Sequence, residues 1–561
     1  MNVAIRLVSS VALLAGCQGT FDGGMGGPGS TEEPATETPE PDPERPTLTA
    51  LFQCDENAPR LPPRLVRLSE RQYAATIQAA FAINGEDPME LSNLPFGLVN
   101  EADRFSTRSR SYRVGEADVE PVLAAARSIA GDAVHRLSRN NASCLAGGGE
   151  FESCLRTIVK ERGQTLFHRP LTEEEITTYV GAAAADAASL DREIAASTAI
   201  EAMLRAPQFL FRSELGAMNN GQLELTTYEL ASAISYAITD GPPDTELWAS
   251  ATQGTLSDPV EIENHVSRLL ARPENNGATQ RFIEEYIHYN YAPDAGKSDT
   301  EFPEHDPQGL VQDTDRFVRS VLETNGRLDF LNALLTSETA FARPSTAWSY
   351  GLEMAGGNGA QEISVANERI GILLQPSWLV SFSEPDKNQP IQRGKFIRET
   401  FLCDDLPALP IPDIEPLAPG ENQTLRETLE MHRANPACAE CHDRMDPLGL
   451  PFEQFDHLGR FRTMEQGRPV VTTGGIVASG PDTDGPVEGP TQMVRRLAES
   501  PMVRQCFISH AFEYWIGLVP DQRVGCAMVG ADQRFETNQD LVGLVATFFS
   551  SDAFRIREES R

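Results

Sequence analysis

One short run of the sequence has the residue types and the spacing for covalent chemistry with a prosthetic group. It is Cys438-Ala439-Glu440-Cys441-His442, a C-x-x-C-H pattern. Two thiols three residues apart lie on one side of a helical turn, so each can add to a vinyl group of a haem. The imidazole that follows is placed to bind the iron as an axial ligand. The pattern therefore predicts one covalent haem c, with thioether bonds to Cys438 and Cys441 and iron ligation by His442.

Three other interpretations of this run are weaker. A structural zinc site needs a second ligand pair, and the sequence has no second C-x-x-C and no pair of histidines at H-x₃₋₅-H spacing. A thioredoxin-type redox pair follows a strand in a βαβ unit, and no such pattern surrounds this run. A disulfide between Cys438 and Cys441 is sterically strained.

The second axial ligand of the iron stays open among three candidates: His432, Met445 and Met464. Met445 comes one helical turn after His442, where packing is the more common role. His432 precedes Pro436, so the chain bends between this histidine and the motif. If no side chain takes the sixth position, the iron is open to peroxide or oxygen chemistry.

The N-terminus predicts export and lipid attachment. Arg6 precedes an apolar stretch over residues 7–15, which is too short to span a bilayer as a helix. Residues 14–17 read Leu-Ala-Gly-Cys and resemble a bacterial lipobox, which implies cleavage before Cys17 and acylation of its side chain. Gln18 favours the outer membrane, with the protein facing the periplasm or the cell surface. Residues 18–48 are rich in Gly, Pro, Thr and Glu and predict a disordered tether.

The net charge limits the possible partners. The chain has 82 acidic and 47 basic residues among 561, a formal charge of −35. This negative field repels nucleic acids. It either only keeps the protein soluble or also attracts a basic redox partner. We therefore expect a membrane contact through the lipid, an exported redox or docking protein, and the cytochrome c maturation machinery as partners, and no nucleic acid.

The cysteines that remain predict disulfides. Once Cys17 is assigned to lipid and two others to haem, six are left, an even number in a chain that meets an oxidising compartment. Short sequence separation favours the pairs Cys144–Cys154 and Cys506–Cys526, which leaves Cys54 with Cys403. The alternative is that one or more of the six stay as buried thiols.

The elements that must position these residues are predicted to be helices. Four Ser or Thr residues are each followed three positions later by Gln or Glu, which predicts capping boxes: Ser69, Thr172, Thr226 and Thr424. Helical periodicity follows over 181–206 and 230–238. Strand signals are sparse and are clearest over 468–477, where Gly474-Gly475 could form a hairpin turn. We expect a mainly α protein with at most a small β-hairpin.

The motif region resembles a known family. Residues 432–442, 445–449 and 452–462 are similar to bacterial multi-domain exported proteins, abundant in planctomycetes and myxobacteria. These proteins are built around the domain of unknown function fifteen-ninety-two, with companions fifteen-eighty-seven, fifteen-ninety-five, fifteen-eighty-eight (a planctomycete-type cytochrome c) and fifteen-eighty-five. Residues 67–73, 169–175, 230–244, 393–395 and 551–555 match in the family's order.

The sequence departs from the family pattern at His168, where the family commonly has Arg, and at Ile234, where it has Leu. The resemblance supports a domain plan and the haem but supplies no substrate. The plan has seven parts: a signal peptide 1–17, a tether 18–48, helical modules 60–130, 144–213 and 222–350, a haem c module 366–465, and a C-terminal helical module 480–557.

Three functions fit these observations. The first is a single-haem electron carrier, either free or docked to an exported oxidoreductase through the long region before the haem module. The second is a haem peroxidase or oxidase with an open iron. The third is a surface lipoprotein that binds polysaccharide or a protein partner without catalysis, although 7% aromatic residues give no sign of a carbohydrate platform.

Overall fold

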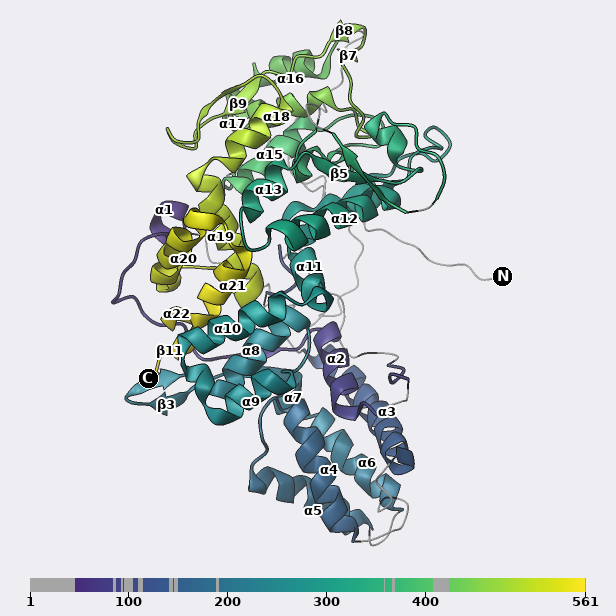
Figure 1. Cartoon of the computed structure of the whole chain (residues 1–561), viewed down its shortest axis with the longest axis vertical. Helices are drawn as coiled ribbons and strands as arrows, with labels where there is room; N and C mark the ends of the chain where they lie inside the picture. The colour runs from purple at the N-terminus through teal and green to yellow at the C-terminus, as the bar shows by residue number, and fades with distance from the viewer. Residues whose placement is uncertain are drawn as a thin grey trace, which may run out of the picture. The chain divides into compact units, whose positions relative to one another are not determined.

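The computed structural model describes residues 46–83, 87–91, 94, 104–108, 115–140, 145, 150–187, 191–357, 359–365, 369–406, 423–434 and 436–559. The chain forms two compact units. We call residues 287–507, with the N-terminal residues up to Leu48, the central unit, and residues 49–286 with 508–561 the split unit. Both are mainly helical, which confirms the predicted fold class (Figure 1).

The split unit contains most of the helices. Three helices extend across a unit boundary: α1 (Leu48–Leu51), α11 (Asn276–Ile287) and α19 (Pro501–Ile516). The others are α2 (Glu70–Phe81), α3 (Glu116–Asn140), α4 (Phe151–Leu166), α5 (Glu173–Ala187), α6 (Arg192–Leu204), α7 (Pro207–Leu210), α8 (Thr227–Thr239), α9 (Thr245–Gln253), α10 (Pro259–Leu270), α20 (Gly525–Asn538), α21 (Leu541–Ser550) and α22 (Asp552–Arg555).

The central unit contains fewer and shorter elements. Its helices are α12 (Pro307–Asn325), α13 (Phe330–Thr336), α14 (Pro376–Ser381), α15 (Pro390–Phe401), α16 (Leu425–Arg433), α17 (Pro436–Gly449) and α18 (Pro490–Ala498). Short 3₁₀ helices occur in both units: η3 (Thr255–Ser257), η4 (Pro273–Asn275), η5 (Tyr289–Ala295), η6 (Ala347–Tyr350), η7 (Ile372–Leu374), η8 (Leu450–Gln454) and η9 (Gln522–Val524).

The four predicted capping boxes are all present. In each, the hydroxyl of the N-cap residue accepts the backbone N–H three residues on. The side chain of that later residue accepts the N–H of the cap, so two helix-end donors are satisfied. The pairs are Ser69–Gln72, Thr172–Glu175, Thr226–Glu229 and Thr424–Glu427.

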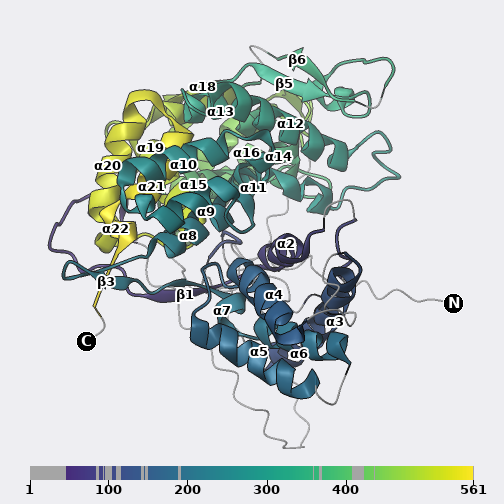
Figure 2. The same cartoon turned by 60° about the horizontal axis from the view of Figure 1, so that its bottom comes forward.

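Helices α2 to α6 form one bundle within the split unit, where α6 packs on α3 and α5 and α4 packs on α2 and α5 (Figure 2). The apolar faces follow the helical repeat; in α4, for example, Leu155, Ile158 and Val159 are buried. The Ala-rich stretch predicted as helical over 181–206 is divided between α5 and α6. The break occurs because Asp191 caps α6 by accepting the N–H of Glu193.

The β-structure consists of small antiparallel sheets. In the split unit, β1 (Arg64–Arg67) pairs with β2 (Phe211–Glu214), and β4 (Gln222–Glu224) lies between β3 (Ala217–Asn219) and β11 (Ile556–Arg557). In the central unit the pairs are β5 (Thr339–Ala342) with β6 (Gln361–Ser364), β7 (Met464–Glu465) with β8 (Arg468–Pro469), and β9 (Gly474–Ile476) with β10 (Gly485–Val487).

The hairpin expected within residues 468–477 is wrong in its pairing. Strand β8 pairs with the strand before it in the chain, β7, and β9 pairs with the strand after it, β10. Gly474 and Gly475 therefore lie in a strand and form no turn. The reason is packing, since a Cβ at Gly474 would lie 2.3 Å from the carbonyl oxygen of Pro447 in α17. Glycine here permits the close approach of β9 to α17.

Residues 1–45 and 407–422 lie outside the described residues, and with them the predicted signal peptide, Cys17, most of the tether and most of the Pro-rich stretch after Asp404. Among the described residues, no helix has the length and apolarity to cross a membrane.

Candidate functional site

The C-x-x-C-H motif lies on α17, so its three functional residues are placed by one helix. Cys438 and Cys441 are three positions apart, which puts both side chains on one side of the helix. Both are free thiols; Cys438 is buried and Cys441 is half-buried. Burial, followed by the charge of Glu440, raises the pKa of the Cys441 thiol, so this thiol is protonated at neutral pH.

His442 is held in one orientation by a carboxylate one turn further along the helix. Its Nδ1 lies 3.0 Å from Oδ1 of Asp446, and both side chains are buried. A carboxylate accepts hydrogen bonds, so Nδ1–H donates to it and Nε2 keeps its lone pair. An acceptor of this kind behind a ligating histidine fixes its tautomer and increases its basicity. The sequence interpretation missed Asp446, although its i,i+4 spacing from His442 was a usable signal.

Helix α17 is held against α15 by two glycines that permit backbone contact. A Cβ on Gly394 of α15 would lie 2.0 Å from the carbonyl oxygen of Met445. A Cβ on Gly449 of α17 would lie 1.8 Å from the carbonyl oxygen of Pro390. Any larger residue at either position forces the helices apart, so these glycines set the distance between α15 and the motif helix.

Two buried arginines of α15 fasten this helix to its surroundings, Arg398 to α17 and Arg393 to α14 and η8. Arg398 donates from Nε to the carbonyl oxygen of Arg444 at 2.9 Å and from Nη1 to Asp404 at 2.6 Å. Arg393 donates to the carbonyl oxygens of Leu379 and Phe452 at 2.9 and 3.2 Å. Because each guanidinium is fully buried, these hydrogen bonds satisfy donors that water cannot reach.

The three candidates for the second axial position lie in different surroundings. His432, on α16, has its ring centroid 4.7 Å from that of His442, with the two rings at 69°. Met445 is buried on α17 itself. Met464 lies on β7 with 51% of its surface exposed. The structure therefore brings His432 and His442 together.

The residues on α17 fit a covalently attached haem. They supply two free thiols at the required spacing and an imidazole whose Nδ1 is engaged by Asp446, which leaves Nε2 as the nitrogen to bind iron. A four-coordinate zinc ion would need at least one further ligand. Among the described residues, no cluster of three or more metal-ligating side chains includes the motif.

The described cysteines outside the motif are in disulfides, but two of the three predicted pairs, Cys506–Cys526 and Cys54–Cys403, are wrong. Cys54 is bonded to Cys526 in the split unit, and Cys403 is bonded to Cys506 in the central unit. The short sequence separation of Cys506 and Cys526 was a poor guide to their distance in space. Residues 507–516 continue α19 and advance the chain about 15 Å along its axis. A disulfide spans at most about 7 Å between Cα atoms. Cys154 is disulfide-bonded, while Cys144 lies outside the described residues.

The comparisons with known families agree with this architecture. Residues 154–214 match PSD5, a protein of unknown function (DUF1595), and residues 225–352 match PSD4 (DUF1592). Residues 369–465 match PSCyt3, also of unknown function (DUF1588), and form a cytochrome c-like module that contains the motif.

No curated protein and no solved structure matches the chain. The three matched domains are three of those that the sequence resemblance named, and they follow in the same order. The chain therefore belongs to the family of multi-domain proteins built from the planctomycete-type domains DUF1595, DUF1592 and DUF1588.

Proposed function

We propose that the chain is an exported, lipid-anchored c-type cytochrome that carries one haem and transfers single electrons. One observation carries this proposal: two free thiols and an imidazole held through Nδ1 by Asp446 lie within five residues of α17. The match of the surrounding residues to a cytochrome c-like module supports it independently.

In this proposal Cys438 and Cys441 hold the haem through thioether bonds, and His442 binds its iron. A haem bound in this way supplies a centre that gains and loses one electron. The chain's own residues fix that centre: Asp446 accepts the Nδ1–H of His442 and prevents the ring from turning. The glycine contact between α15 and α17 keeps the motif helix in place.

We propose His432 as the second axial ligand. It is the candidate whose ring lies next to that of His442, and it comes from a separate helix, α16. Met445 packs within α17 and Met464 is exposed, so neither has comparable support. Two imidazole ligands make an electron carrier, because they leave no iron position open for oxygen or peroxide.

The rest of the chain supports a location and partners for this centre. Cleavage before Cys17 and acylation of its thiol would anchor the protein in the outer membrane, facing the periplasm or the cell surface, with residues 18–48 as a tether. The charge of −35 supports a basic exported oxidoreductase as redox or docking partner. The cytochrome c maturation machinery would attach the haem after export.

The spin state of the iron tests the carrier against the enzyme. The chain is produced with a cytochrome c maturation system, and its spectra are recorded oxidised, reduced, and reduced under carbon monoxide. We expect a low-spin spectrum that carbon monoxide leaves unchanged, and a high-spin form that binds carbon monoxide in His432→Ala. The control, His135→Ala, changes an exposed histidine of α3. A high-spin wild type that binds carbon monoxide would overturn the carrier and favour a haem peroxidase or oxidase.

Fractionation of cells tests the anchor. The wild-type chain is expected in the outer-membrane fraction, and Cys17→Ser is expected to lose its acyl chains and leave that fraction. Equal distribution of the two proteins would contradict the lipid anchor while leaving the haem proposal intact.

A further inference from the structure

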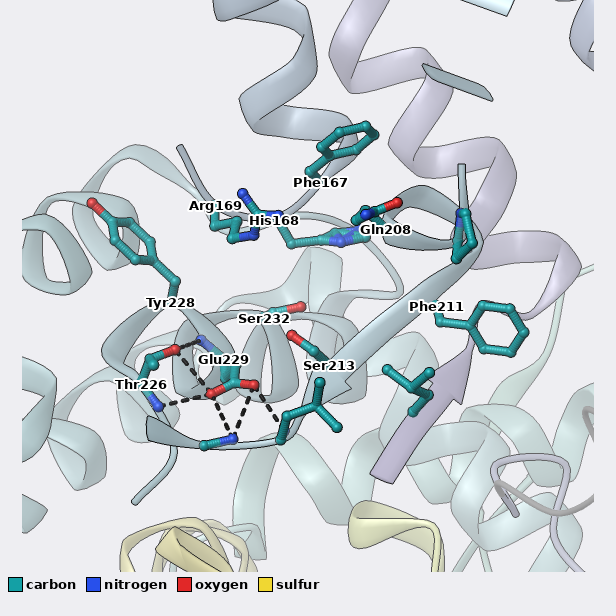
Figure 3. A pocket seen from close by; sticks show the side chains of 14 residues that line it. Phe167, His168, Arg169, Gln208, Phe211, Ser213, Thr226, Tyr228, Glu229 and Ser232 are labelled. Atoms are coloured by element: carbon teal, nitrogen blue, oxygen red, sulfur yellow. Dashed lines mark hydrogen bonds between the residues drawn. The ribbon is translucent and has the colours of Figure 1, made fainter. Parts of the chain in front are cut away.

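A pocket of about 530 Å³ lies in the split unit, built entirely from residues outside the haem module (Figure 3). This volume is within the usual range for sites that enclose small molecules, about 300–1,000 Å³. Its walls include Phe167, His168, Phe211, Ser213, Glu229 and Ser232.

The side chains in the walls are placed by the alternation of side chains along a strand and by the helical repeat. In the β1–β2 ladder Leu65 is opposite Ser213, and both side chains face the pocket together with Phe211. The alternate residues of β2 are buried on the other face. Helix α8 contributes Ser232, one turn before Tyr236.

His168 enters the pocket from the short connection between α4 and α5. Its backbone has a φ of +58°, a conformation that non-glycine residues seldom adopt. Figure 3 shows its imidazole projecting towards Gln208, across the pocket from Ser213 and Ser232. The ring also stands edge-on to Tyr236, with centroids 5.0 Å apart. The fold therefore holds this imidazole in one position.

The charged groups that line the pocket already have hydrogen-bond or ion-pair partners. The carboxylate of Glu229 accepts hydrogen bonds from the backbone N–H groups of Leu215, Gly216 and Thr226 and from the Thr226 hydroxyl. Arg169 forms a two-pronged ion pair with Glu175, at 2.7 and 2.9 Å. An anionic ligand would find no unpaired cation among these residues, and the oxygens of Glu229 are already occupied by donors from the chain, so the pocket favours an uncharged molecule.

A chain of hydrogen bonds determines which nitrogen of His168 carries the proton. The Thr76 hydroxyl donates to the carbonyl oxygen of Gln72 at 2.6 Å, so it must accept from Tyr236, whose hydroxyl lies 2.6 Å away. The Tyr236 hydroxyl has then used its only hydrogen and must accept from Nε2–H of His168 at 2.9 Å. His168 is therefore protonated on Nε2, and its Nδ1 is a hydrogen-bond acceptor.

The imidazole stays neutral in this position. Burial, and then the charges of Arg212 and Arg169, lowers the pKa of His168 to about 3. Its Nδ1 is buried and has no hydrogen-bond partner among the described residues. A buried acceptor without a donor costs about 1–3 kcal/mol, so a ligand that brings a donor gains that energy.

Ser232 supplies a second unsatisfied group. Its side chain is 2% exposed, and its hydroxyl also lacks a partner within the described part of the chain. The remaining surface is mostly apolar and includes the rings of Phe167 and Phe211. A ligand that is mostly apolar and carries one or two hydroxyl groups matches both the apolar surface and the unsatisfied polar groups.

We infer that this pocket binds an uncharged hydroxylated aromatic molecule of the phenol class, whose O–H donates to Nδ1 of His168 while Ser232 makes a second hydrogen bond.

Two probes of similar shape test the inference: phenol, which has the donor, and its methyl ether anisole, which lacks it. Titration calorimetry of the purified full-length chain is expected to show saturable phenol binding, at least about tenfold tighter than anisole binding. The preference is expected to disappear in His168→Phe and to weaken in Ser232→Ala, with His135→Gln as the exposed-histidine control. Equal affinities, no saturable binding of phenol, or an unchanged preference in both variants would overturn the inference.

The protonated nitrogen of His168 can be measured without any ligand and without a variant that has to fold. Nitrogen-15 spectra of the histidine-labelled chain are expected to show a neutral Nε2–H imidazole at pH 7. Phenol is expected to shift Nδ1 as it accepts the new hydrogen bond. A ring protonated on Nδ1 would contradict the proposed recognition.

Discussion

The haem motif and the pocket of the split unit both present a few polar atoms to a ligand, but they assemble those atoms in opposite ways. On α17, Cys438, Cys441 and His442 are neighbours in sequence, and the geometry of one helix brings them together. In the pocket, His168 and Ser232 come from a loop and a helix far apart in the chain. A contiguous site can be identified from a sequence and withstands distant changes. An assembled site can be identified only from the fold and depends on residues that never touch the ligand.

Removing the thiols should have the largest effect on the contiguous site. The double change Cys438→Ser and Cys441→Ser is expected to abolish covalent haem completely, because no other free thiol occurs among the described residues. Haem staining after denaturing electrophoresis measures it. The matched control removes the Cys403–Cys506 disulfide of the same unit and should keep its covalent haem. Staining of the α17 double variant would show that the haem is attached elsewhere.

The contiguous site still needs its helix to be held, which Gly394→Ala and Gly449→Ala test. Each Cβ would lie within 2.0 Å of a backbone oxygen, so each change should destabilise the α15–α17 pair by about 3 kcal/mol or more. Hydrogen exchange of peptides from α17 measures this loss of stability.

Gly131→Ala and Gly530→Ala provide the matched comparison, since no atom lies within 4 Å of their Cβ positions. Both glycines are in helices, so these changes should be stabilising by about 0.5–1 kcal/mol. Equal effects of the two glycine pairs would contradict the close contact between α15 and α17.

The stability of the strands that form the assembled site should decrease in acid, because Glu214 lies behind the pocket wall. Burial alone would raise the pKa of Glu214, but Arg64, Arg557 and Arg212 outweigh it and lower this pKa from 4.5 to about 2. Because the folded pKa lies below the unfolded one, the stabilisation is complete above pH 4.5 and is lost as the pH falls towards 2. The loss should be of the order of 3 kcal/mol.

Hydrogen exchange of the β1–β2 strands between pH 5 and pH 3 measures this loss. Glu214→Gln should be less stable at pH 5 and should lose little more on acidification. The exposed Glu152→Gln should behave like the wild type. An unchanged pH dependence in Glu214→Gln would show that this carboxylate does not hold the strands.

The smallest effect should come from the capping box in front of the motif. Thr424→Ala removes the hydroxyl that accepts the N–H of Glu427 and should destabilise α16 by about 1 kcal/mol. Exchange of α16 amides measures it, with the mid-helix Thr157→Ala expected to change stability by less than about 0.5 kcal/mol. A change that spreads equally through α17 would mean that the two helices open together.

The sequence was sufficient wherever the physics is local. Capping boxes at Ser69, Thr172, Thr226 and Thr424 were predictable because both partners lie within one turn. The mainly helical class and the family were predictable from short patterns of the same kind.

Features that depend on distant partners were not predictable. The disulfides join Cys54 to Cys526 and Cys403 to Cys506, so sequence proximity was a poor guide. Gly474 looked like a turn residue because its contact with α17 is invisible in the sequence. The pocket escaped notice for the same reason, since the role of His168 depends on a hydrogen-bond chain through Tyr236 and Thr76.

The pyridine haemochrome spectrum tests the central claim most directly. The full-length chain is produced with a cytochrome c maturation system, extracted with acidified acetone to remove non-covalent haem, and reduced in alkaline pyridine. The account predicts a c-type spectrum with one haem for each chain, retained at the mass of the protein on a denaturing gel. A chain that loses all its haem on extraction, while a control cytochrome from the same cells keeps its own, would contradict covalent attachment at Cys438 and Cys441.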